Sequence, residues 1–176
     1  MNFLITVLLI IASFITLLLI AGLFMKKDHY VRREMVINAP VEKVFSFLRL
    51  LNNQDKFNKW AKTDTDRFWE HQGTDGTTGY IISWKGNKKA GEGSKEILKI
   101  VEGNRIETEI RFVKPMKVTA SVIMETESLS DNQTKVSLIN SGIMKYPMNL
   151  FIPMAENNFP KDMDESLRSL KSILEK

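Results

Sequence analysis

The amino-acid sequence predicts an α+β domain in which a long C-terminal helix packs on an antiparallel sheet. The segment 159–176 has the apolar periodicity of a helix with one buried face. The stretch between about residues 64 and 142 is typical of strands separated by short turns, and connections of hairpin length make the sheet antiparallel. The apolar stripe of the helix consists of Phe159, Met163, Leu167, Leu170 and Leu174.

A third observation concerns the N-terminus, where the first 25 residues carry no charged side chain. A helix over residues 3–25 would be roughly 35 Å long, and the hydrocarbon core of a bilayer is about 30 Å thick. A cleaved signal peptide is the competing interpretation, but no basic N-terminal region and no small-x-small cleavage site precede Lys26. We therefore expect an uncleaved anchor at residues 1–27, with residues 3–25 in the bilayer, followed by a domain at residues 28–176.

Basic residues follow the apolar segment, and none precedes it. Lys26 and Lys27 come directly after it, and Arg32 and Arg33 lie a few residues further on. Basic residues that flank a membrane span favour the cytoplasmic side. We therefore expect a single-pass protein of the cell membrane with its domain in the cytoplasm.

The composition argues against several classes of function. The net charge is +4, and basic residues are interspersed with acidic ones, so we expect no nucleic-acid partner. The chain has no cysteine, which excludes disulfides, thiol nucleophiles, iron–sulfur clusters and cysteine-ligated zinc. The two histidines, His29 and His71, are far apart in sequence. We expect neither a metal site nor a cofactor, and the oligomeric state stays open.

The domain begins with a strand over residues 29–37. Asn38 is expected to cap the helix that follows, and Pro40 suits the first position of that helix. Apolar residues within 41–48 recur at helical spacing, which predicts a short amphipathic helix.

Polar residues 52–55 are expected to interrupt the helical pattern, and Phe57 and Trp60 indicate a second short helical turn. Six strands bounded by turn-forming residues follow. After an apolar linker, the long C-terminal helix is expected to begin near Pro160. The six strands are expected over residues 67–71, 80–84, 92–101, 105–113, 117–129 and 134–143.

Four segments carry a family resemblance: Val-Ile-Asn-Ala-Pro-Val-Glu-Lys-Val-Phe at 36–45, Trp60, Gly-Glu-Gly at 91–93, and Ser-Gly-Ile-Met-Lys-Tyr-Pro-Met-Asn-Leu at 141–150. They resemble the SRPBCC superfamily, which includes START-like lipid-transfer domains and the polyketide cyclase/dehydrase group. The resemblance covers about residues 29–176. It implies a helix-grip fold, in which a curved antiparallel sheet wraps around a long C-terminal helix and encloses an apolar cavity. The motifs carry no catalytic residue, so none is assigned.

Apolar side chains from the strands and the helix should converge between the two layers. Asn140 is the polar residue best placed to orient a ligand by a hydrogen bond. A second interpretation stays open, because the same apolar residues would also fill an ordinary core and Asn140 also suits the end of a strand. The candidates for ligand contact are Tyr80, Trp84, Ile110, Phe112, Val122, Met124, Leu138, Asn140, Met163 and Leu167.

Other polar residues are weaker candidates for chemistry. His71 would need an orienting carboxylate, but its neighbour Glu70 points to the opposite face of a strand. Asp64 and Asp66 alternate on one side of the chain, but no third metal ligand is indicated. We therefore expect His71 near solvent and the two aspartates in a solvated loop.

Gly91 and Gly93 open a strand without the helix or the lysine of a phosphate-binding loop, so they indicate a bulge or bend. Glu92 and Glu96 lie on the same face as Ser94. On an inward face the two glutamates would be candidate acids in a cavity. We expect them to face outward as ordinary surface charges.

The sequence thus predicts a membrane-tethered domain that binds a lipid or another hydrophobic small molecule between sheet and helix. Two alternatives remain. A cyclase- or hydrolase-type enzyme would require polar or titratable groups that meet in the cavity. A protein-interaction regulator would present a contiguous apolar patch on the outer face of the sheet.

Overall fold

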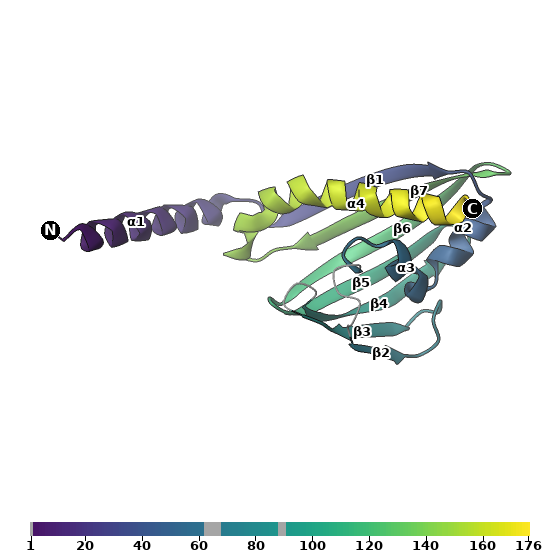
Figure 1. The fold of residues 1–176 in the computed structure, drawn as a ribbon, viewed down its shortest axis with the longest axis horizontal. Coiled ribbons are helices and arrows are strands. Elements are labelled where there is room, and N and C mark those ends of the chain that lie inside the picture. The colour runs from purple at the N-terminus through teal and green to yellow at the C-terminus, as the bar shows by residue number, and fades with distance from the viewer. Residues whose placement is uncertain (1, 62–67, 88–90) are drawn as a thin grey trace.

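An antiparallel seven-stranded sheet with one long helix lying along it makes up most of the structure (Figure 1). The computed structural model describes residues 2–61, 68–87 and 91–176, so Asp64 and Asp66 lie outside the described residues. The strands are ordered β1-β7-β6-β5-β4-β3-β2. Their bounds are β1 Asp28–Ile37, β2 Phe68–Gln72, β3 Ile81–Lys85, β4 Glu92–Val101, β5 Arg105–Lys114, β6 Val118–Ser130 and β7 Gln133–Ile143.

The helices occupy the start of the chain, the connection after β1 and the C-terminus. Figure 1 shows α4 lying lengthwise near β1 and β7, while α2 and α3 lie beside the same sheet. This arrangement confirms the expected helix-grip fold. The bounds are α1 Phe3–Phe24, α2 Val41–Leu48, α3 Leu51–Phe57, a short 3₁₀ helix η2 Met148–Phe151, and α4 Ile152–Leu174.

Helix α3 covers the polar residues 52–55, where the sequence predicted an interruption. The carboxylate of Asp75 accepts hydrogen bonds from the backbone N–H groups of Leu51 and Asn52, at 2.8 and 3.2 Å. These bonds satisfy donors that a helix leaves free at its N-terminus. The cap comes from a residue 24 positions further along the chain, which local sequence patterns do not reveal.

The expected cap of α2 is wrong. Pro40 precedes the first helical residue, and the side chain of Asn38 makes no capping bond. Instead, the Oδ1 atom of Asn38 accepts a hydrogen bond from Gln133, and its backbone N–H donates to Glu175. Asn38 therefore ties the end of β1 to the start of β7 and to the C-terminus.

Helix α4 begins at Ile152, eight residues before the predicted start at Pro160. Pro160 lies inside the helix, where proline costs about 3 kcal/mol because it removes one backbone hydrogen bond. Ile152 and Ala155 are both buried, so the buried face of the helix begins at Ile152, whereas the sequence predicted that it begins at Phe159. We attribute the tolerance of Pro160 to this additional burial.

The C-terminal half of α4 packs into the main core. Leu167, Leu170 and Leu174 are almost fully buried, and they belong to the same core cluster as Leu138 and Met124 on the inner face of the sheet. At about 25 cal/mol per Å² of apolar surface, each buried leucine contributes about 2 kcal/mol. This contact holds the helix on the sheet.

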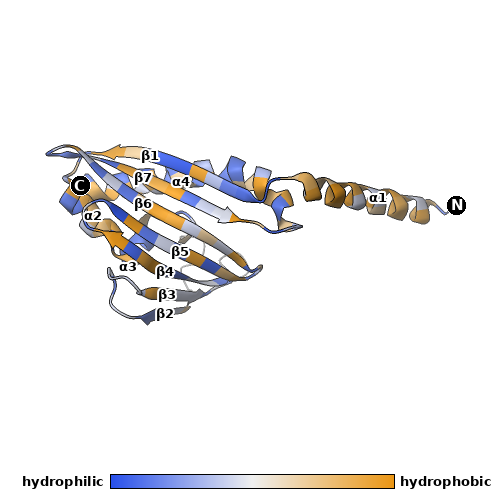
Figure 2. Ribbon diagram, turned by 180° about the vertical axis from the view of Figure 1, so that it is seen from behind, coloured by the Kyte–Doolittle hydropathy of each residue, from blue (hydrophilic) through white to orange (hydrophobic). Residues whose placement is uncertain are grey.

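Helix α1 extends away from the domain, and its composition is apolar along its whole length (Figures 1 and 2). It is long and apolar enough to be a membrane span or a signal sequence. Its C-terminal end contacts the domain. There the amide of Asn149 donates hydrogen bonds to the carbonyl oxygens of Gly22 and Met25, at 2.6 and 3.3 Å, and Lys26 pairs with Glu156 at 2.7 Å.

The burial of Leu167 generates a stability prediction. Leu167→Asp places an unpaired carboxylate in the core, which costs several kcal/mol in addition to about 2 kcal/mol of lost apolar burial. A domain of this size has about 5–15 kcal/mol of stability. We expect thermal unfolding of the full chain in detergent micelles, followed by circular dichroism, to show no cooperative transition or a strongly lowered Tm. The exposed neighbour Arg168 provides the control, because Arg168→Asp should shift the Tm only slightly.

Candidate functional site

A cavity of about 380 Å³ lies between the inner face of the sheet and α4, with further walls from α3 and residues 58–61. Small-molecule sites occupy about 300–1,000 Å³, so this cavity suits a small ligand. Most of its walls are apolar. All three tryptophans of the chain, Trp60, Trp69 and Trp84, line it.

The strand register determines which side chains reach the cavity. Direct partners on neighbouring strands point to the same face, so a row of partners across the sheet presents its side chains together. Two adjacent rows form most of the sheet wall. The row nearer α1 consists of Trp69, Trp84, Gly93, Phe112 and Val118. The next row consists of Ile82, Lys95, Ile110, Ala120, Gly142 and His29.

Gly93 allows two aromatic side chains to meet in the first row. Trp84 and Phe112 are its partners on either side, and their rings meet edge to face with centroids 5.4 Å apart. A Cβ on Gly93 would lie 2.5 Å from the carbonyl oxygen of Arg111 and 2.7 Å from the indole of Trp84. The register of β4 also shifts beside Gly93, which confirms the bulge predicted from Gly91 and Gly93.

One polar pair lies on the β1–β7 side of the cavity. His29 is buried, and its Nε2 donates a hydrogen bond to Asn140 Oδ1 over 2.8 Å. The ring of His29 also contacts Phe159 of α4 edge to face, with centroids 5.7 Å apart. Asn140 accepts this bond through Oδ1, and the N–H₂ group of the same side chain therefore points away from His29. No acceptor contacts this amide nitrogen within the described residues.

A second polar group lies on the β4 side. Lys95 is half-buried, and its ammonium donates to Oε1 of Gln54 on α3. The Gln54 amide is itself fixed, because its Nε2 donates to the carbonyl oxygen of Leu48 at 2.8 Å. Burial in apolar surroundings lowers the pKa of Lys95 to about 8, and the charge of Asp55 opposes this shift.

Eight of the ten predicted contact residues line the cavity. Tyr80 and Leu167 do not. Tyr80 is buried in a separate core cluster with Leu51 and Ile97, and Leu167 belongs to the main core. The eight lining residues are Trp84, Ile110, Phe112, Val122, Met124, Leu138, Asn140 and Met163. Their contact with a ligand stays a prediction.

The sequence analysis missed six polar residues of the cavity, namely His29, Gln54, Asp55, Asn58, Lys95 and Ser166. Strand alternation contained a signal for two of them. Lys95 lies between the inward-facing Gly93 and Ile97, and His29 has the same parity as the buried Val31. Gln54 could not be found in this way, because its position depends on the Asp75 cap of α3.

Glu92 and Glu96 face outward, as expected. Glu96 pairs with Arg111 at 2.8 Å, and Glu92 pairs with Lys114 at 2.9 Å, which holds the pKa of Glu92 below its usual value. Neither glutamate lines the cavity. They are therefore not acids of an internal site.

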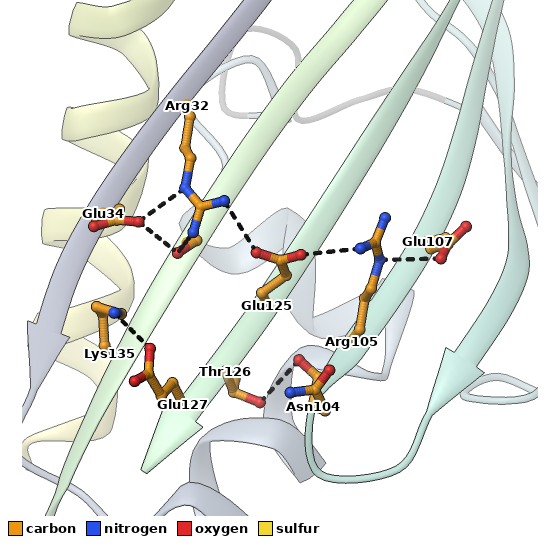
Figure 3. A network of polar contacts seen from close by, with 10 residues as sticks. Arg32, Glu34, Asn104, Arg105, Glu107, Glu125, Thr126, Glu127 and Lys135 are labelled. Atoms are coloured by element: carbon orange, nitrogen blue, oxygen red, sulfur yellow. Dashed lines mark hydrogen bonds and ion pairs between the residues drawn. The ribbon is translucent and has the colours of Figure 1, made fainter. Parts of the chain in front are cut away.

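The outer face of the sheet carries a network of ion pairs (Figure 3). Glu125 accepts from both Arg32, at 3.3 Å, and Arg105, at 3.1 Å, and Glu34 accepts from Arg32 at 2.8 Å. The hydrogen bond from Arg32 keeps the pKa of Glu34 below its usual range. Glu107 extends the network on the β5 side at 3.0 Å from Arg105. The central part of this face is thus charged rather than apolar.

His71 lies on the edge strand β2, where it is exposed. Its Nδ1 atom is 2.7 Å from the hydroxyl oxygen of Tyr80. His71 does not line the cavity. The structure thus places it near solvent, as expected.

The architecture and the internal cavity define a protein of the helix-grip fold. Solved structures share this fold along nearly the whole domain. A protein of Chromobacterium violaceum is 18% identical, with a TM-score of 0.59 over 84% of this chain and 97% of that chain. Ara h 8.0201 is 13% identical, with a TM-score of 0.61 over 84% and 97%. No family model matches the chain, and no curated protein matches it in sequence.

An enzyme is also among the similar structures. Norcoclaurine synthase from Thalictrum flavum, solved in complex with dopamine and hydroxybenzaldehyde, is 7% identical, with a TM-score of 0.63 over 83% of this chain and 86% of that chain. At this level of identity, the comparison shows the fold alone.

The close approach at Gly93 generates a second prediction. In Gly93→Ala, the methyl group must displace the Trp84 indole or bend β4, and such overpacking costs about 1–3 kcal/mol. We expect a lower Tm of the full chain and a changed tryptophan emission spectrum, because Trp84 lines the cavity. Ser94→Ala, one residue along on the outward-facing side, should change neither quantity; an equal effect of both substitutions would contradict the proposed packing.

Proposed function

We propose that this chain is a membrane-tethered binding protein that holds a lipid or another hydrophobic small molecule in the cavity between the sheet and α4. The observation that carries the proposal is an apolar cavity of about 380 Å³ that contains three tryptophans and a few oriented polar groups. This combination is typical of small-molecule sites. Norcoclaurine synthase, which has the same fold, binds two small aromatic molecules, and this supports the proposal by analogy.

The position of the cavity relative to α1 supports membrane tethering. An open groove lies at the end of the sheet from which α1 leaves, between the ends of β1, β6 and β7 and residues 144–148. The groove and the cavity adjoin, since five residues border both. These are His29, Phe112, Val118, Ala120 and Met144. We propose that a hydrophobic ligand enters from the bilayer at this end.

The surface at the same end suits the headgroup layer of a membrane. Large apolar side chains there are exposed beside lysines such as Lys117 and Lys145. Apolar side chains insert at the bilayer interface, and lysines are attracted to anionic lipids. The exposed apolar residues are Val113, Met116, Ile143, Tyr146, Phe151 and Met154.

The proposed organisation is an anchor at residues 1–27 and a binding domain at 28–176. Lys26 and Lys27 favour a cytoplasmic location for the domain. Two alternatives have less support. An enzyme would have to use Lys95, Asp55 and His29, because Glu92, Glu96 and His71 do not line the cavity. A regulator that binds through an apolar outer face is disfavoured, because ion pairs cover the centre of this face.

Filling the cavity should abolish binding without unfolding the domain. Ala120 lies in the middle of the second row, so Ala120→Phe places a ring in the space that a ligand would occupy. We expect decanol or decanoate to change the tryptophan emission of the wild-type full chain in a saturable way, and Ala120→Phe to weaken this response at least about tenfold. Ile123→Phe on the same strand is the matched control, because Ile123 points to the outer face and borders neither the cavity nor the groove. If neither probe changes the tryptophan emission of the wild-type chain in a saturable way, the proposed function is wrong.

The absence of native cysteines permits a direct test of anchoring and orientation. Asp131 is exposed in the β6–β7 turn, at the end of the domain opposite α1, so Asp131→Cys introduces one accessible thiol. In intact cells, we expect a membrane-impermeant maleimide to label this cysteine only after permeabilisation, and the full chain to stay in the membrane after a carbonate wash. Labelling of intact cells would reverse the proposed orientation, and release by carbonate would contradict the anchor.

A further inference from the structure

Lys95 is an unusual residue for the wall of an apolar cavity. It projects from the second row of the sheet between Ile82 and Ile110, its direct partners on β3 and β5. A lysine at a strand position that faces an apolar interior is costly unless its charge is compensated. The surroundings of Lys95 therefore bear on what the cavity holds.

The compensation for this charge is incomplete. Gln54, which is only 2% exposed, gives the ammonium one neutral acceptor. No ion pair joins Lys95 to a carboxylate within the described residues. Asp55 acts on Lys95 only through its longer-range charge. An ammonium has three donors, and Gln54 accepts from one of them, so Lys95 retains hydrogen-bonding capacity for a ligand in the cavity that it lines.

The site around this cation is preorganised. The Gln54 amide cannot rotate freely, because its Nε2 is held by the carbonyl oxygen of Leu48, and α3 is capped by Asp75. The amide therefore presents its oxygen to Lys95 before any ligand binds. A fixed partner of this kind holds the ammonium at one place on the wall, which is the arrangement expected of a binding group.

Charged and polar groups thus occupy opposite sides of the cavity. Lys95 lies on β4, whereas Asn140 lies on β7, three strands away. With strands about 4.8 Å apart, the two sides are separated by about 14 Å of mostly apolar wall. An elongated amphiphile matches this distribution, with its head at one side and its chain along the aromatic row.

We propose that the physiological ligand is a single-chain amphiphile with an anionic head group, carboxylate or phosphate, which pairs with the ammonium of Lys95. This inference rests on the proposed function, since it names the ligand class of the same cavity. Burial of a charge-assisted hydrogen bond between this ammonium and an acidic oxygen supplies the counter-charge that the protein lacks. The modest volume favours one chain over two.

The pH dependence follows from the protonation of Lys95. The titratable side chains that line the cavity, within the part of the chain that the structure describes, are Lys95, Asp55 and His29. Only the protonated lysine attracts an anion, and its pKa in the unliganded protein is about 8. While the anion stays ionised, its affinity should therefore be constant about one pH unit or more below this pKa and fall by about tenfold per pH unit above it, until the pKa of the bound state is reached. Affinity for an uncharged amphiphile should show no such fall.

The test uses the full chain in neutral-lipid nanodiscs, with tryptophan emission as the reporter and decanoate, decyl phosphate and decanol as probes. At about pH 7, we expect at least one of the two anions to bind about tenfold more tightly than decanol. Lys95→Met should remove this preference and leave decanol binding intact, which also shows that the cavity is folded. Lys99→Met, at an exposed position on the same strand, should behave like wild type. The order of the two anions identifies the head group.

Two outcomes would overturn the inference, and they are distinguishable. If decanol binds as tightly as both anions, or if Lys95→Met keeps the preference for the anion, then the acidic head group is wrong while the binding function stands. If none of the three probes gives a saturable response, the proposed function fails, and this inference fails with it.

Discussion

The contact between the C-terminal half of α4 and the inner face of the sheet determines which part of the interior is a packed core and which part is a cavity. Leu167, Leu170 and Leu174 fill the space over the end of the sheet away from α1. The part of the same helix before Leu167 presents Phe159, Met163 and Ser166 to the cavity instead. A helix cannot follow a curved sheet along its whole length, so close packing at one end leaves unfilled space at the other. The aromatic row around Gly93 then lines that space without closing it.

Charged side chains are paired with opposite charges on the outer face of the sheet, whereas the lysine on the inner face has a neutral partner. On the outer face, Arg32, Arg105 and Arg111 each contact more than one carboxylate, and such exposed pairs contribute little individually. On the inner face, Lys95 has one neutral partner. A buried cation without a counter-ion is destabilising, because the desolvation of the ammonium is not offset by a close negative charge. Lys95 lies next to a fixed amide and an open cavity, and this location is the physical reason for proposing that it binds a ligand.

Local patterns in the sequence predicted most of the fold but only part of the site. Alternation located the strands to within one or two residues, because outward charges and inward apolar residues follow the pleat. Pro160 misled the prediction of α4, since a proline inside a helix is tolerated only when tertiary burial offsets its cost, and burial is not visible in a local pattern. The start of α3 depends on Asp75, a residue distant in sequence. Tyr80 has the inward parity of a cavity residue, yet α3 covers it through Leu51, so parity alone could not separate core from cavity.

The segment after β7 and the first turns of α4 connect α1 to the cavity. Met144 lines the cavity, and its backbone N–H donates to the carbonyl oxygen of Lys27 at 2.7 Å. A few residues later, Asn149 is fully buried and caps the end of α1, and Glu156 pairs with Lys26. Because residues 144–156 make all three contacts, the end of α1 is held against the mouth of the cavity rather than joined to it by a flexible linker. A bilayer that contains α1 would therefore meet the domain at the end where the cavity adjoins the open groove, so the cap formed by Asn149 would set the direction from which a hydrophobic ligand arrives.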